Sequence, residues 1–208
     1  MDGVFMWKMI KFVALVLAVS FALEFFGLVR DHGTLQDSLI RLHVVAASDS
    51  AADQSVKLQV RDAVVGYVEN ALDDVMTIEE AKAWLQDHLP DIQQAANRVL
   101  EDLGLCYKAV VTLTAEAFPR RDYDTFSLPS GVYESLRVTL GDGQGQNWWC
   151  VVFPSLCLPA AGEDTESVAA GAGFSDGLTG AVTGKPTYRI RFFFLDVLGK
   201  VENFFFGL

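Results

Sequence analysis

Hydrophobic and polar positions recur with two different periods along the chain, and each change of period marks a new element. Residues 40–46 alternate with one strongly apolar face, which is typical of a strand. Residues 51–72 then place apolar side chains at helical spacing, behind a capping-box pair formed by Ser50 and Asp53. The first half of the chain therefore predicts a strand followed by an amphipathic helix.

A second capping-box pair, Thr77 and Glu80, starts another helical pattern. Pro90 divides this pattern, and we expect one helix to end there and a further helix to begin, ending near Gly104. Period two returns over residues 107–116, which predicts a second strand.

The last third of the chain continues with the same two periods. Residues 135–140 and 147–153 alternate as strands, and the sequence GDGQGQ between them predicts a hairpin turn that makes these strands antiparallel. A phosphate-binding loop is disfavoured because a strand, not a helix, follows the glycines. A wide apolar stripe over residues 187–208 predicts a terminal helix. Together the elements predict an α+β domain of two layers, with a roughly four-stranded mixed sheet packed with three to four helices.

An apolar run of a different kind opens the chain. Lys8 and Lys11 precede twelve uncharged residues, 12–23, with small residues near their end, as in an export signal. The alternative is an uncleaved anchor that continues through Phe26, although the uncharged run is shorter than the roughly 20 residues of a spanning helix. We expect the following divisions: a signal peptide or membrane anchor over 1–23, a linker over 24–39, a core domain over 40–158, a flexible insert over 159–186 and an amphipathic helix over 187–208.

Composition narrows the function classes. The net charge of -11 disfavours a nucleic-acid partner, because an acidic chain without a basic stripe is repelled by phosphates. Hydrophobic residues make up 51% of the chain, which is enough for a core and excludes disorder throughout.

The export prediction determines the expected redox state of the three cysteines. Outside the reducing cytosol a pair persists as a disulfide, and Cys150 and Cys157 are close in sequence on either side of Pro154. We therefore predict a Cys150–Cys157 disulfide, with Cys106 packed as a small hydrophobic residue.

Two chemical alternatives compete with this interpretation. Cys150 is a conceivable nucleophile with His43 as its base and Asp49 or Asp62 to orient the imidazole, but no local signature supports this. Asp49, Asp53 and Asp62 are acidic enough to attract a cation, yet their spacing suits helix capping and a solvated face better than a calcium loop. We expect no metal site, no cofactor and no enzymatic activity.

Two segments and the export signal together resemble the stage II sporulation protein R family of endospore-forming bacteria. The segments are IRLHVVAASDSAADQSVKLQVRDAVV at 40–65 and FPRRDYDTFSLPSGVYESLRVTLGDGQGQNWWCVVFPSLC at 118–157. The chain departs from the family at Ala47, where Asn is expected. The positions that carry the resemblance in the second segment are Phe118, Pro119, Tyr123, Pro129, Gly131, Tyr133, Leu136, Arg137, Val138, Gly141, Gly145, Asn147, Trp148, Trp149, Cys150, Phe153, Pro154 and Cys157.

The resemblance implies a signalling protein. Members of the family are exported from the forespore into the space between the forespore and mother-cell membranes. There they activate a membrane-embedded aspartic protease of the mother cell, which processes the precursor of a sigma factor. The resemblance assigns no catalytic residue.

Polar and aromatic side chains on predicted loops and strands are the candidates for contact with that partner. Trp148 and Trp149 are adjacent on a strand and so point to opposite faces, which leaves one of them available for an interface. We expect the terminal helix to be buried on the sheet, with membrane or partner contact as the alternative. A competing hypothesis is an exported cysteine hydrolase of cell-wall material that uses Cys150 and His43. The predicted partner-binding residues are Arg41, Arg61, Arg120, Arg121, Tyr123, Trp148 and Trp149.

Overall fold

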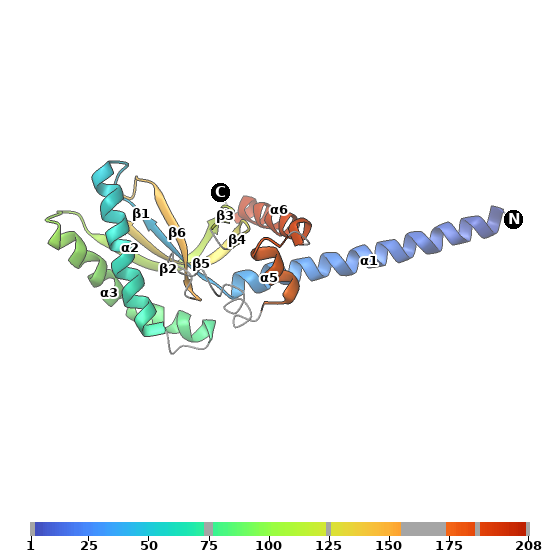
Figure 1. Cartoon of the computed structure of the whole chain (residues 1–208), viewed down its shortest axis with the longest axis horizontal. Coiled ribbons are helices and arrows are strands. Elements are labelled where there is room, and N and C mark those ends of the chain that lie inside the picture. The colour runs from blue at the N-terminus through green and yellow to red at the C-terminus, as the bar shows by residue number, and fades with distance from the viewer. Residues whose placement is uncertain (1–2, 73–76, 124–125, 155–173, 186–187, 207–208) are drawn as a thin grey trace.

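The computed structural model of the chain describes residues 3–72, 77–123, 126–154, 174–185 and 188–206 (Figure 1). It confirms an α+β fold in which helices pack on a four-stranded mixed sheet behind an N-terminal apolar helix. The helices are α1 (Gly3–Asp37), α2 (Ala51–Leu72), α3 (Ile78–Asp102), α5 (Asp176–Val182) and α6 (Arg189–Phe206). The strands are β1 (Ile40–Val45), β2 (Ala109–Phe118), β3 (Arg121–Asp122), β4 (Ser127–Leu128), β5 (Gly131–Leu140) and β6 (Asn147–Phe153).

The sheet has the order β2-β5-β1-β6, with β1 parallel to β5 and antiparallel to β6. The last two strands, β5 and β6, therefore run in opposite directions as predicted but are not neighbours, and the predicted hairpin is wrong. The first strand lies between them, so the glycine-rich loop crosses the end of β1 instead of turning back on its own strand.

The loop between β5 and β6 is built around the chain that leaves β1. The amide of Gly145 donates to the carbonyl of Ala46 at 2.9 Å, and that of Gln144 donates to Ala47 at 3.2 Å. A Cβ atom at Gly145 would lie 2.3 Å from the Ser48 carbonyl oxygen. Glycine is required here because two backbone segments touch, not because an anion binds.

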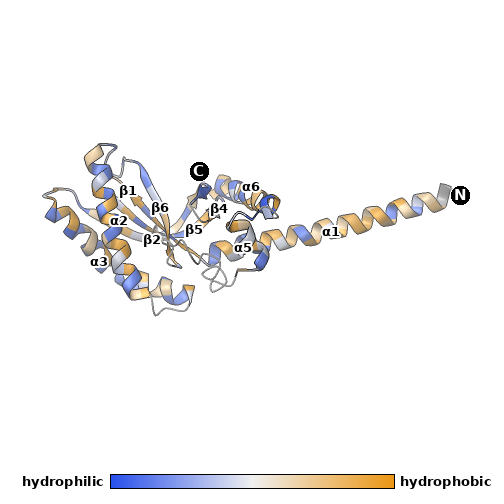
Figure 2. Ribbon diagram, in the orientation of Figure 1, coloured by the Kyte–Doolittle hydropathy of each residue, from blue (hydrophilic) through white to orange (hydrophobic). Residues whose placement is uncertain are grey.

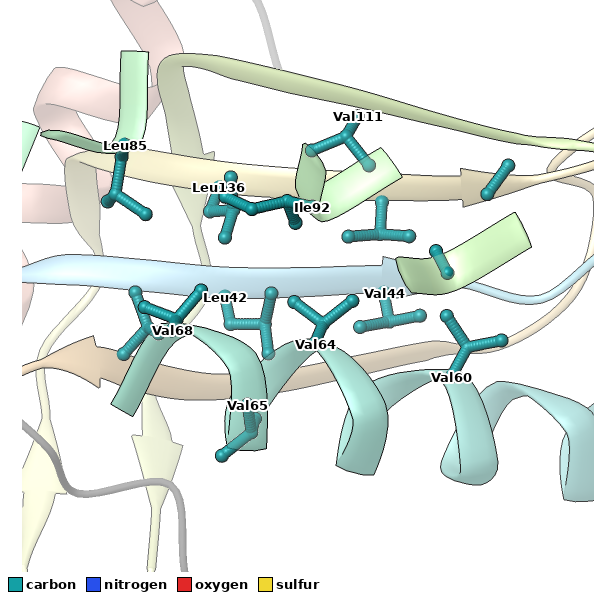
Figure 3. Packing of buried hydrophobic residues seen from close by; sticks show 14 of the residues in the cluster. Leu42, Val44, Val60, Val64, Val65, Val68, Leu85, Ile92, Val111 and Leu136 are labelled. Carbon is teal, nitrogen blue, oxygen red and sulfur yellow. The ribbon is translucent and has the colours of Figure 1, made fainter. Parts of the chain in front are cut away.

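Helices α2 and α3 cover one face of the sheet and form the larger core. Figure 3 shows Leu42 and Val44 of β1 facing Val64 and Val68 of α2, with Leu85 and Ile92 of α3 nearby. All six side chains are fully buried. The alternation in β1 and the 3.6 period in α2 thus meet along one seam, as the sequence pattern predicts.

Helix α3 runs through Pro90 without ending, which corrects the prediction of two helices. Its capping box at Thr77 and Glu80 is present in full. Proline removes one helical hydrogen bond and strains the preceding turn. Leu85 and Ile92, on either side of the proline, are both fully buried in the same core, and this burial offsets the loss.

Among the described residues, the opposite face of the sheet is covered at one end, by α5, α6 and the last turns of α1. Leu35, Leu39, Phe192 and Leu195 form a second buried cluster there. A Cβ atom at Gly199 of α6 would lie only 1.6 Å from the Ser130 carbonyl oxygen, so the helix touches the start of β5. At the other end of this face, β2 residues such as Thr112 and Thr114 remain exposed.

Helix α1 extends away from the domain and carries apolar residues along most of its length (Figures 1 and 2). Over Phe5–Asp37 it is long and apolar enough to cross a membrane, and it is compatible with either a signal or an anchor. The helix continues through the region predicted as a linker, and its last turns are fixed to the domain. Gln36 donates to the Val132 carbonyl at 2.8 Å, and Arg191 of α6 pairs with Asp31.

Part of the predicted flexible insert is ordered. Residues 176–182 form α5, which buries Leu178, Ala181 and Val182 in the second cluster. Ser175 caps this helix by accepting from the amide of Leu178 at 3.2 Å. Residues 155–173, which hold Cys157 and the first part of the predicted insert, lie outside the described residues, as does residue 186 at its end.

Candidate functional site

A polar network crosses the middle of the half-covered face of the sheet. His43 of β1 lies between Glu116 of β2 and Asn147 of β6, with Nδ1 3.2 Å from Glu116 Oε2 and Nε2 2.9 Å from Asn147 Oδ1. Arg137 of β5 donates to Glu116 Oε1 at 2.5 Å. One carboxylate therefore joins three strands of the sheet on the face that α6 leaves partly open.

The environment of Glu116 stabilises its charged form. Burial alone would raise the pKa of this carboxyl, but the hydrogen bond and charge of His43, together with the hydrogen bond from Arg137, lower the pKa to about 2. Because the folded-state pKa lies below the unfolded value of 4.5, the network stabilises the fold above that pH.

We expect the free energy of unfolding to fall as the pH is lowered from about 4.5 to about 2, by at most about 3 kcal/mol from this group. Glu116→Gln should remove that part of the slope, and urea unfolding across the pH range measures it. Asp87→Asn, on the exposed surface of α3, is the matched control and should keep the slope. An unchanged slope in Glu116→Gln would show that the network contributes nothing.

Arg41 lies next to this network and is completely buried. Its guanidinium carbon is 4.0 Å from the centre of the Phe118 ring and 5.2 Å from that of Tyr133. Nη2 donates to the hydroxyl of Tyr123 at 2.9 Å, whereas Nε and Nη1 have no hydrogen-bond partner among the described residues. A buried cation with two unpaired donors is costly, so a fold that retains one does so for another reason.

The β3–β4 hairpin places a second arginine beside the first. Tyr123 links Arg41 on β1 to β6, because its hydroxyl also lies 3.3 Å from the Trp149 carbonyl oxygen. The guanidinium of Arg121 lies 3.7 Å from the centre of the Trp149 ring, and its Nε is buried without a hydrogen-bond partner in the described part of the chain. Burial, and then the charge of Arg41, lowers the pKa of Arg121.

We call Arg41, Arg121, Tyr123 and Trp149 the arginine face. These four residues were among the seven predicted to bind a partner, and the structure brings them together from β1, from β3 and the turn that follows it, and from β6. Arg121, Tyr123 and Trp149 border a surface hollow between the hairpin and the edge strand β6, and the buried Arg41 lies behind them in contact with Tyr123. The hollow is lined by Arg121, Asp122, Tyr123, Gln146, Asn147, Trp148 and Trp149.

The other three predicted residues lie apart from this face. Arg61 of α2 stacks on Trp148, with its guanidinium 4.3 Å from the ring centre, on the side of the sheet that α2 covers. Trp148 and Trp149 therefore point to opposite faces, as expected, and both reach the hollow. Arg120 pairs with Asp122 at 2.8 Å and stacks on Phe192 of α6, so it helps to dock α6.

The geometry excludes the Cys150–His43 dyad. Cys150 belongs to the core beneath α2 and α3, whereas His43 faces the opposite side of the sheet toward Trp149, with the two ring centres 5.6 Å apart. A proton cannot pass between a thiol and an imidazole on opposite faces of a sheet. Cys106 carries a free thiol and is exposed, which corrects the expectation that it is packed.

The three aspartates considered as cation ligands each have another partner. Asp53 accepts from Ser48 at 2.5 Å and from Tyr107 at 2.7 Å, and these hydrogen bonds lower the pKa of Asp53. Asp49 accepts from the amide of Gln146 at 2.8 Å, and Asp62 pairs with Arg61. These contacts fix the segment after β1 to α2 and to the glycine-rich loop. No group of three metal-binding side chains occurs among the described residues.

Sequence reasoning missed Glu116, Arg137 and Asn147. The alternation in each strand shows which side chains share a face, but the register between strands decides which of them meet. In this sheet His43 lies opposite Arg137 on β5 and opposite Trp149 on β6. The sequence did contain a signal for this network, since three strands carry polar residues at positions that face away from the main core. An analysis of the apolar positions alone overlooks them.

Comparisons with known proteins identify the family. Residues 36–163 match the sequence profile of the family described as stage II sporulation protein R. A protein named Stage II sporulation protein R from Bacillus subtilis (strain 168) is 39% identical over 124 residues, which cover 60% of this chain and 55% of that relative. No solved structure matches the chain. The matched region contains the whole arginine face and the sheet that carries it, and the chain belongs to the stage II sporulation protein R family.

Proposed function

We propose that the chain is an exported signalling protein that activates a membrane-embedded aspartic protease of the neighbouring mother cell. The activated protease then processes the precursor of a sigma factor. The family assignment supports a role in sporulation. The apolar α1 provides a means to enter or cross a membrane, so we place the domain in the space between the forespore and mother-cell membranes.

The observation that carries this proposal is the arginine face. Two guanidinium groups with unpaired buried nitrogens lie together under a tyrosine and a tryptophan. Arginine and aromatic residues are the types that contribute most to protein interfaces. The separation of Cys150 from His43 removes the basis of the competing cysteine hydrolase. We therefore assign this surface to binding, not to bond cleavage.

The arginine at the hollow indicates which chemical group on the partner would bind there. Arg121 lines the hollow, so a carboxylate on an extracytoplasmic segment of the protease would pair with its guanidinium there, while the fully buried Arg41 holds Tyr123 in place through their hydrogen bond. Hydrogen bonds to charged groups contribute about 1.5–3 kcal/mol each, so two such bonds from Arg121 to one carboxylate supply about 3–6 kcal/mol. This range includes the roughly 5.5 kcal/mol that moves a two-state protein from 1% to 99% active.

Activation requires that the chain bind the active state of the protease better than the inactive state. The test is to co-reconstitute the protease and its sigma-factor precursor in vesicles and to titrate the purified chain from the outside. We expect processing to rise and saturate. Unchanged processing at a concentration where binding is saturated would contradict the proposal.

We also propose the Cys150–Cys157 disulfide, on the basis of export and of the close spacing of the two cysteines. Cys150 is not free, unlike Cys106, and Cys157 lies outside the described residues. Denatured protein should take up one alkyl group without reductant and three after reduction, as measured by intact mass. Three alkyl groups without reductant would show that the disulfide is absent.

A further inference from the structure

Helix α6 leaves much of its apolar surface uncovered, contrary to the expectation that it is buried. Ile190, Phe193 and Phe194 near its start are 74%, 61% and 48% exposed. The helix buries Phe192, Leu195 and Gly199 on its inner side. Soluble domains seldom expose so many large apolar side chains on one helix unless the surface meets a partner or a membrane.

The first half of α6 lies beside the apolar part of α1. A mainly apolar groove between the two helices is lined by Phe25 and Leu28 of α1 and by Ile190 and Phe194 of α6. Phe21, Glu24 and Arg191 complete its lining. Arg191 pairs with Asp31 at this crossing and holds the two helices together. The start of α6 is therefore fixed at the level where the apolar surface of α1 reaches the domain.

We propose that the first half of α6, through Ile190, Phe193 and Phe194, inserts into the membrane interface beside α1. If the apolar part of α1 lies in a bilayer, Ile190 and Phe194 reach the same depth, because they line one groove with Phe25 and Leu28. Phe193 lies beside them, with its ring centre 5.6 Å from that of Phe194. The domain then lies directly on the membrane surface, without a spacer. The far end of α6, with Phe204 and Phe205, is attached to the sheet, since Asn203 donates to the Phe118 carbonyl at 2.8 Å.

A lipid occupant fits this surface better than a second protein chain does. Phe12, Leu15 and Phe21 of α1 are all exposed, as expected for a helix surrounded by lipid. Arg30 and Arg189 are exposed near the groove, where basic side chains suit anionic headgroups. The surface thus combines a mainly apolar centre with a charged border that contains these arginines and also Glu24.

The contact does not depend on whether the export signal is removed. The small residues at which cleavage is predicted, at positions 18–22, precede Phe25 and Leu28. These two residues and α6 would remain in the mature protein. After cleavage the proposed surface would hold the domain to the membrane as a peripheral protein.

Site-specific photocrosslinking tests the proposal on the full chain. Benzoylphenylalanine is introduced in place of Phe193 and, as a matched control on the same helix, in place of Phe205. Each protein is reconstituted in vesicles of phosphatidylcholine and phosphatidylglycerol, irradiated and analysed by mass spectrometry. A probe in place of Phe12 in α1 reports that the chain is inserted.

We expect the probe at position 193 to give about tenfold more lipid adduct than the probe at position 205, because only the first half of α6 reaches the bilayer. Equal adducts at both positions would overturn the proposal. So would an adduct to a second copy of the chain in place of lipid. Adducts at position 12 without adducts at position 193 would also overturn it.

Discussion

Arg41→Met should abolish activation of the partner while changing the free energy of unfolding by less than about 1.5 kcal/mol. The substitution removes a buried cation that has two unpaired donors, which is favourable. It also removes the hydrogen bond to Tyr123 and the stacking between Phe118 and Tyr133, which together cost about 2–3 kcal/mol. The two effects on stability largely cancel, whereas Tyr123, which lines the hollow, loses the hydrogen bond that positions it for binding.

Urea unfolding and the vesicle processing assay measure the two effects of Arg41→Met separately. Arg137→Met is the contrasting control, because Arg137 has a carboxylate partner in Glu116. Its loss leaves that half-buried carboxylate less well paired and should cost about 1–2 kcal/mol. If Arg41→Met instead costs more than about 3 kcal/mol and the folded protein still activates, Arg41 has a structural role alone.

Gly199→Ala should detach α6 from the sheet. The added Cβ would lie 1.6 Å from the Ser130 carbonyl oxygen and 2.9 Å from the Gly131 nitrogen, so backbone atoms must move. The shift would break the hydrogen bonds from the amide and hydroxyl of Ser130 to Asp196, at 2.9 and 2.6 Å, and expose the second buried cluster. We expect a cost of about 3 kcal/mol or more.

Hydrogen exchange and urea unfolding measure the effect of Gly199→Ala on the amides of α6 and on the whole domain. The matched control is Gly66→Ala in α2, where a Cβ has no atom within 4 Å. That substitution should stabilise the chain by about 0.5–1 kcal/mol, since alanine favours a helix more than glycine does. Wild-type exchange in α6 of Gly199→Ala would contradict the close contact with Ser130.

The local pattern in the sequence predicted where helices and strands lie better than it predicted which strands are adjacent in the sheet. The 3.6 period over residues 51–72 and the alternation over residues 147–153 match α2 and β6 in the structure. The adjacency of β5 and β6 could not be predicted, because a turn signal does not show whether a third strand lies between the two that it joins. The continuity of α3 through Pro90 likewise depends on burial contributed by distant residues.

The same holds for the candidate site, where local features were predicted and contacts between distant residues were not. The alternation of side chains along a strand predicted that Trp148 and Trp149 lie on opposite faces of the sheet, and they do. The contact of Arg41 with Tyr123 joins residues 82 positions apart, and no periodicity predicts it. Arg120 and Arg121 were both predicted to bind a partner because both are polar. In the structure Arg120 instead packs on Phe192 of α6. The fold therefore shows which of the predicted partner-binding residues lie together at the hollow, and whether they bind a partner stays a prediction.

The central claim is that the arginine face is the surface that meets the partner. Hydrogen exchange of the chain, alone and with the reconstituted protease, tests this most directly. We predict that peptides covering residues 121–123 and 146–149 become protected in the complex. Unchanged exchange in both peptides, with protection confined to the outer surfaces of α2 and α3, would contradict the claim.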